Sequence, residues 1–264
     1  MSENVCIVQL SDDQYYQERK NCVRSVATYC ASMGYRWKGL VGTLDRDTHI
    51  AFQKPLALLR EIENFKYIGW MDLDVAIANR SFDLFNYLER ANQDVVVCRD
   101  PSFFSEDMIN SGVVFFKNTH LSKKILQDWW SMRVIGVDKH WRQQAGNGDA
   151  DQQFLNKIIK QNNIVAHNPH NLNVHPSKYS IGDFAVHFMG YKPIDYDRFV
   201  EYANTNIKSQ KLLNKYWMVY GFQSHDLIER VYEYGREDVM RDRGYSPEDI
   251  YNCAKQLIDI DVPH

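Results

Sequence analysis

Two aspartates at alternate positions, Asp72 and Asp74, are the residues of this chain best suited to chemistry. Alternate residues of an extended chain point to the same side, so the two carboxylates would share a small space and repel each other. They follow an apolar run at 67–71 that is typical of a buried strand, and ligand sites of α/β sheets lie beyond the carboxyl ends of strands. A divalent cation that prefers oxygen ligands, Mg²⁺ or Mn²⁺, would relieve the repulsion. Two aspartates can also simply cap a turn, but the apolar lead-in favours the metal interpretation.

A histidine in a later apolar run offers a further metal ligand. His187 lies in segment 184–189, which predicts a strand, and a neutral imidazole is a competent metal ligand. Taken alone, a histidine in such a strand is more often a satisfied core residue. Just beyond it, Gly190 would let the backbone approach a ligand closely, and Lys192 offers a compact positive charge for phosphate.

Three further groups carry weaker signals. Asp151 and Gln152 follow a glycine-containing turn at the start of a predicted helix, where an aspartate also serves as a natural N-cap. The segment Asn110-Ser111-Gly112 precedes a predicted strand, and a plain turn explains it equally well. Lys54 could reach a phosphate or simply face solvent.

Alternating strand-like and helical stretches must position these residues. The apolar patterns predict strands at 5–10, 67–71, 94–98 and 112–116, and helices at 12–33, from 55 onward, at 121–132 and at 151–161. This alternation predicts an α/β domain over residues 1–195, with a single mixed, mainly parallel sheet flanked by helices. Residues 196–264 are expected to form a C-terminal helical appendage packed on that domain.

The composition excludes several classes of protein. The chain has 264 residues, of which 44% are hydrophobic and 25% charged, so long disorder is not expected. A net charge of -3 argues against a general nucleic-acid binder. The five cysteines include no CxxC pair, which argues against a disulfide framework and indicates reduced thiols in a cytoplasmic protein. No stretch reaches the ~18 apolar residues that a transmembrane segment needs.

Taken in order, these motifs resemble a glycosyltransferase with the GT-A fold, of the galactosyl/xylosyl/α-mannosyl-transferase family. Segment 70–79 resembles the family's metal-binding DxD stretch, and segment 110–119 resembles its N-S/T-G stretch. Asp151-Gln152 is similar to the family's DQ pair, and segment 187–193 to its H-F-x-G-x-K segment. Each motif is weak alone, but four in this order are specific. The resemblance covers roughly residues 5–195 and implies the GT-A fold for domain 1–195.

The resemblance implies a role for each matching residue. Asp72, Asp74 and His187 would hold Mn²⁺ (or Mg²⁺) against the donor diphosphate. Asp151 and Gln152 would be the catalytic residues, close to the anomeric carbon. The donor, a UDP-sugar by the same resemblance, would be bound by Gln9, Leu10, Ser11, Lys54, Asp72, Leu73, Asn110, Ser111, Gly112, Gly190 and Lys192.

The implied reaction is the metal-dependent transfer of a sugar from a nucleotide diphosphate sugar to a hydroxyl of a glycan or glycoside acceptor, with retention of anomeric configuration. It agrees with the chemistry of the residues, because a departing diphosphate needs the positive charge that a metal and a lysine supply. The membrane-anchored members of the family carry an N-terminal transmembrane stem. This chain shows no such segment, so we expect a cytoplasmic enzyme or one domain of a larger glycan-building protein.

Two other functions fit some of the same residues. Phosphatases and phosphotransferases of the haloacid-dehalogenase type also end a strand in DxDx[TV], with the first aspartate as nucleophile and the second as general acid. Those roles would fall to Asp72 and Asp74, but such enzymes carry the motif near the N-terminus and need a later acidic pair, which segment 148–153 does not convincingly supply. A non-catalytic nucleotide-sugar-binding domain is the second alternative, and the intact carboxylates and His187 argue against it.

Overall fold

The protein is described by a computed structural model, which covers residues 4–100, 108–133, 150–167, 172–176, 179–180 and 182–189. Gly190, Lys192 and the expected appendage at 196–264 lie outside the described residues. Within the described part, no helix has both the length and the apolar character needed to cross a lipid bilayer.

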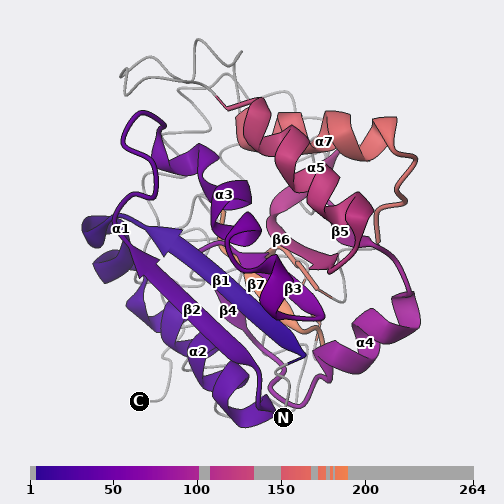
Figure 1. Cartoon of the computed structure of the whole chain (residues 1–264). Helices are drawn as coiled ribbons and strands as arrows, with labels where there is room; N and C mark the ends of the chain where they lie inside the picture. Colours follow the sequence, from indigo (N-terminus) through magenta and orange to yellow (C-terminus); the bar gives the residue numbers. More distant parts are fainter. Residues whose placement is uncertain are drawn as a thin grey trace, which may run out of the picture. The chain divides into compact units, whose positions relative to one another are not determined.

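A five-stranded mixed sheet forms the centre of the domain (Figure 1). Strand β1 runs parallel to β2 and β3, while β6 runs antiparallel to both β3 and β5, so four strands point one way and β6 points the other. This confirms the predicted mainly parallel sheet. The strands, in spatial order, are β2 (Arg36–Val41), β1 (Val5–Ser11), β3 (Tyr67–Met71), β6 (Ile109–Lys117) and β5 (Val95–Arg99).

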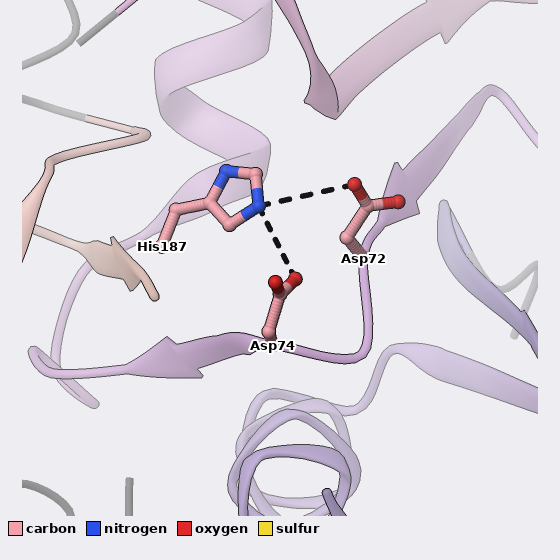
Figure 2. A group of neighbouring side chains, drawn as sticks. All are labelled: Asp72, Asp74 and His187. Carbon is pink, nitrogen blue, oxygen red and sulfur yellow. Dashed lines mark ion pairs between the residues drawn. The ribbon is translucent and has the colours of Figure 1, made fainter. Parts of the chain in front are cut away.

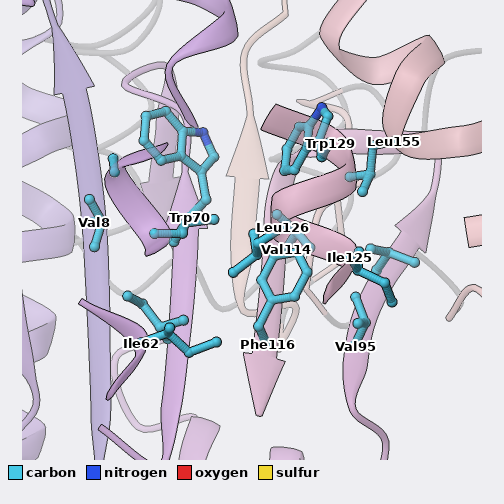
Figure 3. Close-up of a cluster of buried hydrophobic side chains, with 14 of the residues drawn as sticks. Val8, Ile62, Trp70, Val95, Val114, Phe116, Ile125, Leu126, Trp129 and Leu155 are labelled. Carbon is cyan, nitrogen blue, oxygen red and sulfur yellow. The ribbon is translucent and has the colours of Figure 1, made fainter. Parts of the chain in front are cut away.

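In the part of the chain that the structure describes, one face of the sheet packs against three helices. Side chains alternate between the faces of a strand, so Val8, Trp70 and Phe116 point to this side together. They meet Leu126 and Trp129 from the helical layer in a buried hydrophobic cluster (Figure 3). The helices of this layer are α3 (Lys54–Leu59), α5 (His120–Ser131) and α7 (Ala150–Gln161), and short 3-10 turns at Ile50–Phe52 and Ile62–Asn64 flank α3.

The described elements that cover the opposite face are two helices and a small second sheet. Ile7, Tyr67 and Phe115 point to this side and share a cluster with Tyr29 and Phe184. The two-stranded sheet was not expected from the sequence, which predicted one sheet, because its first strand has only three residues. The elements of this layer are α2 (Lys20–Met33), α4 (Leu84–Ala91), β4 (Val75–Ile77) and β7 (Ala185–His187).

The helix expected at 12–33 is divided in two. Helix α1 (Asp13–Glu18) begins where the Asp12 carboxylate accepts a hydrogen bond from the Tyr15 backbone N–H at 2.7 Å. The helical conformation is interrupted at Arg19, and α2 then runs on to Gly34. Gly34 ends it with φ of 69°, a left-handed backbone that glycine adopts without steric cost.

Candidate active site

Three segments meet at the carboxyl end of β3. Asp72 follows β3, and its backbone N–H donates to the Gly112 carbonyl at 2.8 Å, which fastens the turn to the first half of β6. Asp74 ends that turn, directly before β4. Strand β7 pairs antiparallel with β4 and places His187 opposite Val75, beside both aspartates.

The three side chains converge on one point (Figure 2). His187 Nε2 lies 3.2 Å from Asp74 Oδ1 and 3.8 Å from Asp72 Oδ2. One ligand atom from each residue lies within 4.8 Å of the other two. His187 and Asp74 are buried and Asp72 is partly exposed, so Asp72 is the most solvent-accessible member of the cluster. Two carboxylates and an imidazole form a donor set that fits Mn²⁺ or Mg²⁺, and they are the three residues that the sequence predicted as ligands.

The charges of this cluster depend on one another. Burial raises the pKa of the Asp74 carboxyl, but the facing His187 outweighs that effect and holds the pKa below its ordinary value. Burial in turn lowers the pKa of His187, while Asp74 first and then Asp72 bring it above its ordinary value. The two carboxylates therefore favour the protonated form of His187 in the absence of a cation. A metal ion would use the same imidazole lone pair that binds this proton.

Lys54 joins this cluster to the DQ pair. Its Nζ lies 2.9 Å from Asp72 Oδ1 and 2.9 Å from Asp151 Oδ2, and it also donates to Ser111 Oγ at 3.4 Å. Burial lowers the pKa of Lys54, but Asp151 and then Asp72 outweigh it and hold the pKa well above its usual range. Lys54 is therefore a permanent cation between two carboxylates, and not a lysine that faces solvent.

The DQ pair is bound to the first half of β6. Asp151 Oδ2 accepts from Ser111 Oγ at 3.0 Å, and Gln152 Oε1 accepts from the Ser111 backbone N–H at 3.1 Å. Gln152 Nε2 donates to Asp100 Oδ2 at 3.0 Å, so its amide is hydrogen-bonded at both ends. The structure thus brings Asp151, Gln152 and Ser111 together beside Lys54. A role for Asp151 and Gln152 at the anomeric carbon stays a prediction.

The residues at the end of β1 that were predicted to bind the donor lie beside the turn that carries Asp72 and Asp74. Gln9 Nε2 donates to the Asp72 carbonyl at 3.3 Å, while its Oε1 accepts from Trp37 Nε1 at 2.9 Å. Leu10, Ser11 and Leu73 are buried. These contacts support the turn, and the predicted donor contacts of the four residues remain to be tested.

Sequence reasoning missed Trp70 and Asn173, each of which contacts one of the predicted metal ligands. Trp70 Nε1 donates to Asp72 Oδ1 at 2.6 Å and orients that carboxylate. Its position two residues before Asp72, on the same side of the strand, was a usable signal. Asn173 is fully buried and its Oδ1 lies 3.1 Å from His187 Nδ1. It belongs to an irregular segment whose sequence carries no periodic pattern, so nothing in the sequence indicated it.

Comparison with known proteins adds a family and a fold. A family model described as nucleotide-diphospho-sugar transferase matches residues 56–219, more than half of the chain. No curated protein matches the chain.

Solved structures of similar shape are glycosyltransferases. One, involved in the glycosylation of the major capsid of PBCV-1, has a TM-score of 0.56 at 18% identity, over 75% of this chain and 99% of its own. The apo-form glycosyltransferase GlyE of Streptococcus pneumoniae TIGR4 has a TM-score of 0.52 at 14% identity, over 81% of this chain and 63% of its own. The bifunctional glycosyltransferase WbbM has a TM-score of 0.51 at 13% identity, over 81% and 52%. These likenesses confirm the predicted GT-A fold.

Proposed function

Since the chain belongs to the nucleotide-diphospho-sugar transferase family, we propose that it transfers a sugar from a UDP-sugar to a hydroxyl of a glycan or glycoside, with retention and with Mn²⁺ at Asp72, Asp74 and His187. The chain is a glycosyltransferase by family. The metal, the nucleotide, the stereochemistry and the acceptor are the parts that this proposal adds. One observation carries it: two carboxylates and an imidazole nitrogen converge at the carboxyl end of β3, where an α/β sheet binds its ligands.

The proposed cation would be held by Asp72, Asp74 and the Nε2 atom of His187. When bound, it would supply a Lewis acid for the diphosphate that leaves the sugar. Lys54 adds a second positive charge beside Asp72. Of the two predicted phosphate contacts, Lys192 would add a third charge, and Gly190 would let the backbone approach the phosphate. Positive charge fixed in place before the reaction stabilises the departing diphosphate without reorganisation.

Asp151 is the residue that we propose to act at the anomeric centre. Both contacts that the described residues make with its carboxylate fall on Oδ2, from Lys54 and from Ser111. Oδ1 is the oxygen that we assign to the developing positive charge of the sugar. Retention is proposed to follow a front-face path, in which a leaving phosphate oxygen takes the proton of the acceptor hydroxyl. Gln152 would hold Ser111 of β6 in place beside the first turn of α7, by accepting a hydrogen bond from the Ser111 N–H.

The nucleotide and the metal are tested by calorimetric titration. UDP and GDP are titrated into the wild type and into Asp74→Ala, each with and without Mn²⁺. We expect UDP to bind in a Mn²⁺-dependent manner, and we expect the Asp74→Ala variant to lose that dependence. Asp128→Ala is the matched control, because Asp128 is a partly exposed carboxylate on α5 whose described partner is Lys124.

The outcome also separates the alternatives. Release of UDP from a UDP-sugar in the presence of an acceptor shows turnover and excludes a purely binding domain. If neither nucleotide binds, and a phosphatase activity disappears in Asp72→Asn, the dehalogenase-type function replaces the one proposed here.

The roles of the DQ pair are tested separately by kinetics. We expect Asp151→Asn to lower kcat by at least a factor of about 100, since removal of one charged group that stabilises a transition state has effects of that size. Gln152→Ala is expected to lower kcat as well, because the backbone N–H of Ser111 loses its acceptor. Turnover close to that of the wild type in either variant would exclude that residue from the proposed mechanism.

A further inference from the structure

His187 has a second hydrogen-bonding partner behind it. Its Nε2 faces Asp72 and Asp74, while its Nδ1 lies 3.1 Å from Asn173 Oδ1. Asn173 Nδ2 in turn donates to Asn110 Oδ1 at 2.9 Å. All three side chains are buried, so each of their polar groups needs a hydrogen-bonding partner within the protein.

The direction of these hydrogen bonds is fixed by the contacts of Asn110, the member of the series that is farthest from His187. Asn110 Oδ1 also accepts from the backbone N–H of Gly112 at 2.8 Å, and a backbone N–H can only donate. The other end of the Asn110 amide, Nδ2, faces Met189 Sδ at 3.2 Å, and a thioether sulfur can only accept. Both neighbours therefore place the oxygen of Asn110 toward Asn173.

The orientation of the Asn110 amide determines that of Asn173, which in turn determines the tautomer of His187. Because Asn110 presents oxygen, Asn173 must present its NH₂ group to it and its oxygen to His187. His187 must then carry a proton on Nδ1, since that atom faces an acceptor. A neutral imidazole protonated on Nδ1 has its lone pair on Nε2, the nitrogen that faces the two aspartates.

Gly112 also makes room for the ring. A Cβ at this position would overlap His187 Cε1 and lie 2.7 Å from Nδ1. Gly112, whose N–H fixes the orientation of the Asn110 amide, therefore also lies against the imidazole ring of His187.

We propose that Asn173 and Asn110, with the Gly112 N–H, form a polarised amide relay that holds His187 with its Nε2 lone pair toward Asp72 and Asp74. Asn173 and Asn110 are positioning residues, which act on the metal through His187. This inference rests on the proposed function, because it explains how the predicted third ligand is kept ready for a cation. A partner that orients a ligating histidine commonly changes metal affinity by about 10–100-fold when it is removed.

Metal affinity is the first test. Mn²⁺ binding in the presence of UDP is measured by electron paramagnetic resonance for the wild type and Asn173→Leu. We expect Asn173→Leu to bind Mn²⁺ at least about tenfold more weakly.

The matched control is Asn156→Leu. Asn156 is also a buried asparagine, with its Oδ1 accepting from the Ile109 N–H and its Nδ2 facing Met108 Sδ, and it is not part of the relay. We expect both leucine variants to lose stability and only Asn173→Leu to lose metal affinity. Equal affinities in the two variants would overturn the proposal.

The protonated nitrogen of His187 is read directly by nuclear magnetic resonance of the ring nitrogens. The metal-free full chain is measured in alkaline buffer, where the ring is neutral. We expect the proton on Nδ1, and a proton on Nε2 would overturn the relay even if Mn²⁺ binds. If the wild type binds no Mn²⁺ while Nδ1 carries the proton, the relay is supported and the proposed function fails.

Discussion

Among single residues, Lys54 carries the positive charge that joins the two acidic groups of the site. We expect Lys54→Met to lower the free energy of unfolding by about 3 kcal/mol without metal, because it leaves Asp72 and Asp151 without their cation. Mn²⁺ should restore part of this loss, since it brings positive charge beside Asp72. Denaturant unfolding with and without Mn²⁺ measures both effects.

The control for Lys54 is Lys66→Met. Lys66 lies 2.7 Å from Glu89 Oε2 in a partly exposed pair, for which a loss below about 1 kcal/mol is expected. Losses of equal size in the two variants, or a metal effect no larger in Lys54→Met than in the wild type, would contradict the bridging role.

Gly112 is the second residue for which a substitution gives a sharp result. Gly112→Ala pushes a methyl group into the His187 ring, and overpacking of this kind costs about 1–3 kcal/mol. In a His187→Ala background the ring is gone, so the cost should shrink. Part of it should remain, because the new Cβ also lies 2.9 Å from Asn110 Oδ1. A double-mutant cycle of unfolding free energies measures the coupling, and strictly additive losses would show that the two groups do not meet.

Among the secondary-structure elements, those with strong apolar runs were predictable and the others were not. Strand β3 is fully buried, and its uninterrupted apolar run marks both the strand and the aspartates that follow it. Among the described strands, β2 pairs with β1 alone, and none of its side chains is buried, so its sequence shows no apolar alternation. Strand β4 is too short to produce a pattern, although its pairing with β7 brings His187 to the site. The candidate metal ligands could therefore be found from the sequence. The pairing of β4 with β7, which brings His187 to the two aspartates, could not.

The small β4–β7 sheet should respond most strongly to a bound cation. An isolated pair of short strands is marginally stable, and Asp74 and His187 lie at the same end of this pair. We expect Mn²⁺ with UDP to slow amide hydrogen exchange in peptides that contain residues 74–77 and 185–188. Helix α5 packs on the opposite face of the main sheet and should change little.

Asp74→Asn is the control for the exchange experiment. It keeps the size of the side chain and removes the charge, so added Mn²⁺ should no longer protect the two strands. Equal slowing of exchange in β4, β7 and α5 would show a general stabilisation. It would contradict a cation effect confined to the small β4–β7 sheet.

For the molecule as a whole, buried thiols on both faces of the main sheet report how the domain opens. Cys6 belongs to the cluster under α3, α5 and α7, while Cys30 and Cys98 belong to the cluster under α2 and α4. Burial raises the pKa of Cys30 and of Cys98 to about 12. Because the thiolate is the reactive form, alkylation of these residues requires the domain to open first.

If the two faces open together, Cys6, Cys30 and Cys98 should be alkylated at the same rate, as a cooperative domain requires. UDP and Mn²⁺ at 100 times the dissociation constant should slow all three rates by about 100-fold, since ligand binding stabilises the closed state by about 2.7 kcal/mol. Peptide mapping by mass spectrometry follows each cysteine separately and leaves aside Cys253, which lies outside the described residues. Faster reaction at Cys98 than at Cys6 would show instead that the face bearing β4 and β7 opens independently. The ligand effect should then be largest at Cys30 and Cys98, because the site lies at the end of that small sheet.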